Sequence, residues 1–116
     1  MSEKQKLLIV DDSELNRDIL KEILGSSYDY LEAENGTQAI QILEVHPEID
    51  LMLLDINMPQ MNGFQVLEHM RELQWIDEVP VVMISSEESV EIMRKAYDLG
   101  ITDYISRPFD AVIVKK

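Results

Sequence analysis

The sequence contains no cysteine and is poor in glycine and proline, with four of each among its 116 residues. Without cysteine there are no disulfides, thiolate nucleophiles or cysteine-ligated zinc sites, so the apolar core alone must hold the fold together. Because hydrophobic residues make up 46% of the chain, collagen-like and disordered chains are excluded as well. A chain of this length and composition is expected to form one compact domain.

Long apolar runs are also absent, since none approaches the ~20 residues that a helix needs to cross a bilayer. Residues 1–6 are mostly polar, and the apolar stretch that follows them is too short for the core of a signal peptide. We therefore expect an unsecreted, cytoplasmic protein that makes no contact with a membrane.

Basic residues are scarce: the chain has 10 lysines and arginines against 23 aspartates and glutamates, which gives a formal net charge of −13. Affinity for nucleic acids depends on lysines and arginines that neutralise phosphates. This domain is therefore not expected to bind nucleic acid. A cation, or a basic surface on a partner protein, is a more natural ligand for it.

Two kinds of apolar pattern alternate along the chain. Short apolar runs, typical of buried strands, cover residues 6–10, 49–55 and 79–84, and further short strands are expected at residues 28–34 and 101–106. Between them, apolar residues recur at helical spacing within residues 13–24, 39–43, 64–73 and 90–99. This alternation predicts an α/β fold with a doubly wound, five-stranded parallel sheet and helices on both faces. In such folds, ligands bind beyond the carboxyl ends of the strands.

Polar residues mark the carboxyl ends of four predicted strands. Asp11 and Asp12 follow the first strand, Asp55 ends the third, Ser85 follows the fourth and Arg107 follows the fifth. Carboxylates held ~4 Å apart repel by roughly 4 kcal/mol at an effective dielectric constant of ~20, so the three aspartates call for a cation. Oxygen ligands without histidine or cysteine favour Mg²⁺, or Mn²⁺, over zinc.

A divalent ion beside a carboxylate, a hydroxyl and a basic side chain is suited to holding a phosphoryl group. Asp55 is the candidate nucleophile, because carboxylates form aspartyl phosphates and this one ends the most apolar strand. A phosphatase with an aspartate nucleophile generally needs a second aspartate two residues later, where this chain has Asn57. Nucleotide binding is disfavoured as well, because no glycine-rich turn follows the first strand.

Four motifs carry a family resemblance: LIVDDS at 8–13, LLDINMP with MNGF within 53–64, PVVMISS at 80–86 and GITDYISRPF at 100–109. In this order they resemble the receiver domain of two-component response regulators, over nearly the whole chain. The resemblance implies a flavodoxin-like (βα)5 fold and phosphorelay signal transduction. It further implies that the domain turns over no external substrate and promotes only its own phosphorylation and dephosphorylation.

The resemblance also implies a mechanism. Asp55 would accept a phosphoryl group from a phosphohistidine on a sensor histidine kinase. Mg²⁺ would be held by Asp12, Asp55 and the backbone carbonyl of Asn57, with Asp11 assisting through water. Once Asp55 is phosphorylated, the Ser85 hydroxyl would move toward the phosphoryl oxygens.

Further positions take their roles from the resemblance alone. Tyr104 would turn inward after phosphorylation, and Asn57 and Glu87 match places that tune dephosphorylation. The face formed by the fourth helix, the fifth strand and the last helix would contact an output domain or a downstream protein, and it is also where a homodimer would form.

Two departures from the family pattern leave an alternative open. The usual lysine before the proline is Arg107 here, and a guanidinium is longer and forked where an ammonium is compact. Residues 110–116 allow only about two helical turns, so the last helix is short or truncated. We therefore expect residues 1–116 to be a receiver domain at the N-terminal end of a longer regulator. The alternative is a degenerate receiver that acts as a phosphorylation-independent interaction module.

Overall fold

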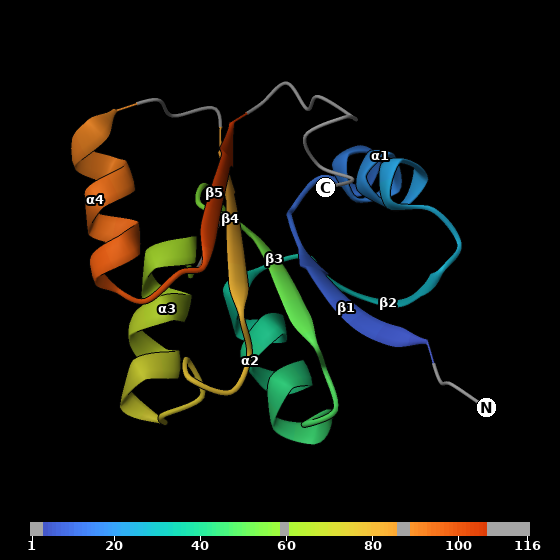
Figure 1. Cartoon of the computed structure of the whole chain (residues 1–116), viewed down its shortest axis with the longest axis horizontal. Coiled ribbons are helices and arrows are strands. Elements are labelled where there is room, and N and C mark those ends of the chain that lie inside the picture. Colours follow the sequence, from blue (N-terminus) through green and yellow to red (C-terminus); the bar gives the residue numbers. More distant parts are fainter. Residues whose placement is uncertain (1–3, 59–60, 86–88, 107–116) are drawn as a thin grey trace.

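The fold is that of a computed structural model, which describes residues 4–58, 61–85 and 89–106. Strands and helices alternate along the chain (Figure 1). The strands are β1 (Gln5–Val10), β2 (Tyr28–Ala33), β3 (Leu51–Asp55), β4 (Val81–Ser85) and β5 (Asp103–Ser106). The helices in this part of the chain are α1 (Glu14–Leu24), α2 (Gly36–Val45), α3 (Gly63–Glu72) and α4 (Val90–Asp98). The predicted order of elements is confirmed.

All five strands join one sheet in the order β2-β1-β3-β4-β5, and every neighbouring pair is parallel. From β1 the chain first moves outward to β2 and then crosses back to β3 on the other side of β1. The doubly wound, flavodoxin-like topology is therefore confirmed. The point where the winding direction changes lies between β1 and β3, which is where ligands of such folds bind.

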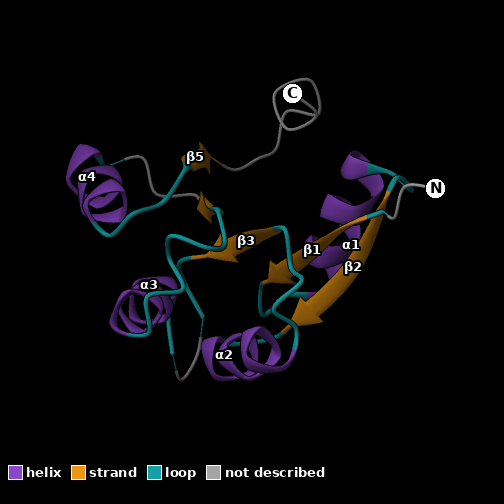
Figure 2. Cartoon of the chain, turned by 60° about the horizontal axis from the view of Figure 1, so that its bottom comes forward, coloured by secondary structure: helices purple, strands orange, loops and turns teal. Residues whose placement is uncertain are grey.

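The two faces of the sheet are covered by different helices (Figure 2). On one face, buried residues of β1, β3 and β4 pack with Leu20 of α1. On the other face, the alternate residues of the same strands pack with residues of α2, α3 and α4, among them Leu43, Leu67 and Ala96. Each of the three central strands contains four consecutive apolar residues, because it buries side chains on both faces.

Three strands begin later than their apolar runs predict. Ile49, Val79 and Ile101 are buried, yet each lies two residues before its strand. An apolar run reports burial, which extends beyond the residues that pair in the sheet. In the part of the chain that the structure describes, no helix combines the length and the apolar character that a membrane span requires.

Candidate functional site

Asp55 is the last residue of β3 and is buried, with 5% of its surface exposed. Its strand lies between β1 and β4, so neighbours on both sides fix its backbone. The Gly63 N–H at the start of α3 donates a 2.9 Å hydrogen bond to the Ile56 carbonyl. A Cβ atom at Gly63 would lie only 2.5 Å from the Asp55 backbone oxygen. Glycine therefore permits α3 to begin directly against the carboxyl end of β3.

Asp11 and Asp12 continue from β1 at the neighbouring position. Val10 pairs with Leu54 in the sheet, so the residues that follow them lie side by side. Asp11 is 1% exposed, and its Oδ1 accepts a 2.9 Å hydrogen bond from the Ser13 N–H. Ser13 in turn caps α1, because its side chain accepts a hydrogen bond from the Asn16 N–H. These bonds tie the acidic segment to the first turn of α1.

The predicted acidic cluster is present in the structure. One carboxylate oxygen from each of Asp11, Asp12 and Asp55 can be chosen so that all three lie within 4.8 Å of one another. Asp11 and Asp55 are buried while Asp12 is exposed, so the cluster opens to solvent on one side. Three oxygen ligands converging on one point fit a hard divalent cation such as Mg²⁺, which keeps several of its own waters.

The structure also places three other predicted residues near this edge of the sheet. Ser85 is fully buried at the end of β4, one residue beyond the position that pairs with Asp55. Asn57 is exposed two residues after Asp55, and Tyr104 is buried on β5 opposite Met83. Glu87 and Arg107 lie outside the described residues.

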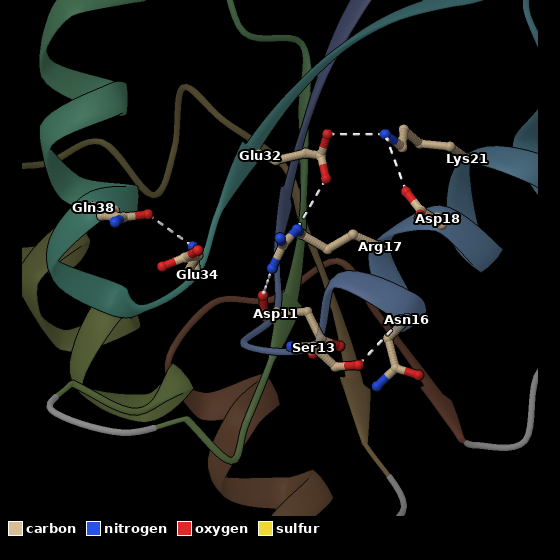
Figure 3. A network of polar contacts seen from close by, with 9 residues as sticks. All are labelled: Asp11, Ser13, Asn16, Arg17, Asp18, Lys21, Glu32, Glu34 and Gln38. Atoms are coloured by element: carbon tan, nitrogen blue, oxygen red, sulfur yellow. Dashed lines mark hydrogen bonds and ion pairs between the residues drawn. The ribbon is translucent and has the colours of Figure 1, made fainter.

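Arg17 joins the site from a position that the sequence reasoning missed (Figure 3). Its guanidinium donates from Nη1 to the Asp11 carbonyl oxygen at 2.6 Å and from Nε to Glu32 Oε1 at 2.9 Å. Lys21 donates to the other Glu32 oxygen at 2.9 Å and also lies 3.4 Å from Asp18. The sequence did contain one signal for this role: Arg17 lies three residues before Leu20, at a position of the helix that faces the core, where a cation is unusual.

The opposite charges of Glu32, Lys21 and Arg17 stabilise one another's ionised forms. Hydrogen bonds from Lys21 and Arg17 lower the pKa of the Glu32 carboxyl below its ordinary value of 4.5. The same contact with Glu32, helped by Asp18, raises the pKa of Lys21. Glu32 is therefore ionised at neutral pH and can neutralise the buried Arg17 guanidinium.

Together, the fold and the site define a class of protein. Its members are doubly wound parallel α/β domains with an acidic cluster, suited to binding a cation, at the point where the winding direction of the sheet changes. Within that class, the model of the response regulator receiver domain matches residues 7–115, and the chain belongs to this family. It is thus a CheY-like receiver domain of two-component signalling, a family that binds Mg²⁺ through such a cluster and serves as a signalling module rather than as a substrate-turnover enzyme.

Individual relatives agree with this family. The chemotaxis protein CheY1 of Helicobacter pylori is 34% identical over 113 residues, which cover 96% of this chain and 91% of that protein. The two-component response regulator ORR3 of rice, Oryza sativa, is 32% identical, with 88% of this chain and 79% of that protein covered. A crystal structure of a CheX-CheY-BeF3-Mg complex from Borrelia burgdorferi superposes with a TM-score of 0.87 at 30% identity, covering 95% of this chain and 83% of that chain.

Proposed function

We propose that this receiver is switched by phosphorylation of Asp55, with a sensor histidine kinase as the donor. The observation that carries the proposal is the convergence of Asp11, Asp12 and Asp55 within 4.8 Å at the switch point of the sheet. In the reaction, an Asp55 carboxylate oxygen attacks the phosphorus of a phosphohistidine. The O–P bond forms as the P–N bond breaks, and the imidazole nitrogen keeps the electron pair and is reprotonated from water.

The residues of the site divide this work. Asp11, Asp12 and Asp55, with the backbone carbonyl of Asn57, would hold Mg²⁺. When bound, the ion neutralises the clustered carboxylates and the phosphoryl oxygens. The rigid end of β3 keeps the attacking oxygen in place, since Asp55 lies between two paired strands. The CheY of the Borrelia complex was crystallised with Mg and BeF3, which supports the choice of magnesium.

Signal output would pass from Ser85 to Tyr104 and the α4–β5 face. Ser85 and Tyr104 lie on adjacent strands, two register positions apart, and both are buried. A hydroxyl drawn toward a phosphoryl group at Asp55 would therefore shift the packing beside Tyr104. On α4, Val90 and Tyr97 are exposed and offer apolar contact surface to an output domain, a downstream protein or a second copy.

Intact-mass spectrometry after incubation with acetyl phosphate tests the central step. We expect the mass to rise by one phosphoryl group when Mg²⁺ is present, and this gain to be lost in Asp55→Asn. Asp29→Asn is the matched control, because Asp29 is exposed on β2 and away from the cluster. No gain in the parent, under conditions that modify a control receiver, would favour the binding-only alternative.

Sedimentation with and without a phosphoryl mimic would test for the homodimer.

A further inference from the structure

The Arg17 guanidinium is held in one geometry by its surroundings. Its side chain is 9% exposed, and a buried charge is tolerated only when it is paired and hydrogen-bonded. Glu32 supplies the opposite charge at 2.9 Å, and the Asp11 carbonyl oxygen accepts from Nη1 at 2.6 Å. The planar fork therefore bridges the carboxyl ends of two adjacent strands, β2 and β1, from the side of α1 (Figure 3).

The Asp11 carbonyl belongs to the peptide that joins the two neighbouring aspartates of the cluster. Because a peptide unit is planar, fixing its oxygen also fixes the direction in which Asp12 begins. The preceding peptide is fixed as well, since the Asp11 N–H donates to the Ala33 carbonyl at 3.0 Å. The Ser13 N–H then orients the Asp11 side chain. Arg17 thus provides a direct contact to the peptide that sets the two carboxylates relative to each other.

We propose that Arg17 is a positioning residue for the cation site of this receiver. It holds the Asp11–Asp12 peptide so that both carboxylates face Asp55, while Glu32 holds the Arg17 fork in place. Arg17 itself touches neither the ion nor the phosphoryl group in this scheme. The inference rests on the proposed function, in which the acidic cluster binds Mg²⁺.

Charge and geometry predict opposite effects of removing Arg17. By Coulomb's law alone, the loss of a positive charge near three carboxylates strengthens the binding of a cation. Loss of the peptide contact weakens it, because the carboxylates are no longer held in one arrangement. Lys21 is the matched control for charge: it also pairs with Glu32 at 2.9 Å, but its other partner is Asp18.

The experiment measures Mn²⁺ binding to the full chain by electron paramagnetic resonance, with Mg²⁺ as a competitor. We expect Arg17→Met to weaken the affinity for both ions about 10-fold, as changes beside metal ligands commonly do. Arg17→Lys should weaken it severalfold, because one ammonium does not reproduce the fork. Lys21→Met should leave the affinity unchanged or raise it.

Each result separates the two hypotheses. If the parent chain binds neither ion, the proposed function fails and the inference fails with it. If the parent binds but Arg17→Met and Arg17→Lys bind as tightly or more tightly, only the positioning role is overturned. A merely structural Arg17 would lower the melting temperature without changing the affinity of the folded protein. If circular dichroism shows that Arg17→Met is unfolded, the affinity of Arg17→Lys tests the positioning role instead, since this variant keeps the charge.

Discussion

At the scale of single residues, Gly63 is the position where an added methyl group would meet the backbone of the site. Its Cβ would lie 2.5 Å from the Asp55 oxygen and 2.9 Å from Ile56 Cα, and neither atom can rotate away as a side chain would. We expect Gly63→Ala to destabilise the fold by about 1–3 kcal/mol and to slow phosphorylation of Asp55. Urea unfolding and the acetyl phosphate assay measure the two effects.

The control for this change is Glu68→Ala, because Glu68 is exposed on the same helix. It should change the free energy of unfolding by less than about 0.5 kcal/mol. Equal stabilities of Gly63→Ala and the parent would show that α3 can move away from β3 at no cost, contrary to our expectation.

Glu32 makes the stability of the fold depend on pH. Its pKa in the fold is lowered from 4.5, chiefly by the Lys21 hydrogen bond, so its ionised form is favoured by folding. That stabilisation is fully present above pH 4.5 and is lost as the pH falls through the lowered pKa. We therefore expect Glu32→Gln to destabilise the chain at pH 7 and the difference from the parent to narrow as the pH is lowered below 4.5. A difference that stays constant in urea unfolding over this pH range would contradict this assignment.

The acidic cluster could be predicted from the sequence, but Arg17 was not. Asp11, Asp12 and Asp55 end apolar runs, and a parallel sheet brings the ends of its strands together whatever the detailed packing. The role of Arg17 depends on two specific contacts, one of them with a backbone oxygen. A backbone acceptor has no signature in the sequence, so only the structure reveals it.

At the scale of elements, α3 begins with a reciprocal cap. The Asn62 side chain accepts from the Gln65 N–H at 3.0 Å, and the Gln65 side chain accepts from the Asn62 N–H at 2.9 Å. Asn62→Ala removes one half of this capping box and should cost about 1 kcal/mol of stability. Ser89→Ala is the control, because Ser89 precedes α4 without a side-chain capping bond among the described residues. Chemical denaturation of both variants measures the contrast, and equal losses would count against the cap.

Helical spacing predicted the helices more reliably than it predicted their buried sides. Leu15 fits the apolar spacing of α1 but is 68% exposed, while Arg17 is buried. On α4, Val90 and Tyr97 are likewise exposed. Spacing shows that a segment is helical, whereas the side that becomes buried depends on where the sheet and its neighbours lie.

At the scale of the whole molecule, the net charge of −13 opposes the compact state, and the acidic cluster concentrates that repulsion. Mg²⁺ should therefore raise the melting temperature more than NaCl does at equal ionic strength. At 100 times its dissociation constant, specific binding adds about 2.7 kcal/mol to the free energy of unfolding. Differential scanning calorimetry in the two salts measures the specific part. Equal shifts in both would mean that Mg²⁺ acts only by screening.

Asp12→Asn should separate repulsion from binding. Asp12 is the exposed member of the cluster, so its neutralisation is expected to stabilise the metal-free chain by about 1 kcal/mol at most. The same variant should lose most of the stabilisation by Mg²⁺, because one of the three carboxylates of the cluster becomes a neutral amide. Calorimetry in both salts tests this too, and an unchanged response to Mg²⁺ would remove Asp12 from the ion site.

The strand order has one more consequence, for how the chain behaves in concentrated solution. β2 and β5 are the outer strands of the sheet, the places where sheets of different molecules join when proteins aggregate. Each outer strand carries an exposed aspartate, Asp29 on β2 and Asp103 on β5. Like charges on approaching edges repel, so the acidity that suits the cluster to a cation also keeps neighbouring molecules from extending one another's sheets.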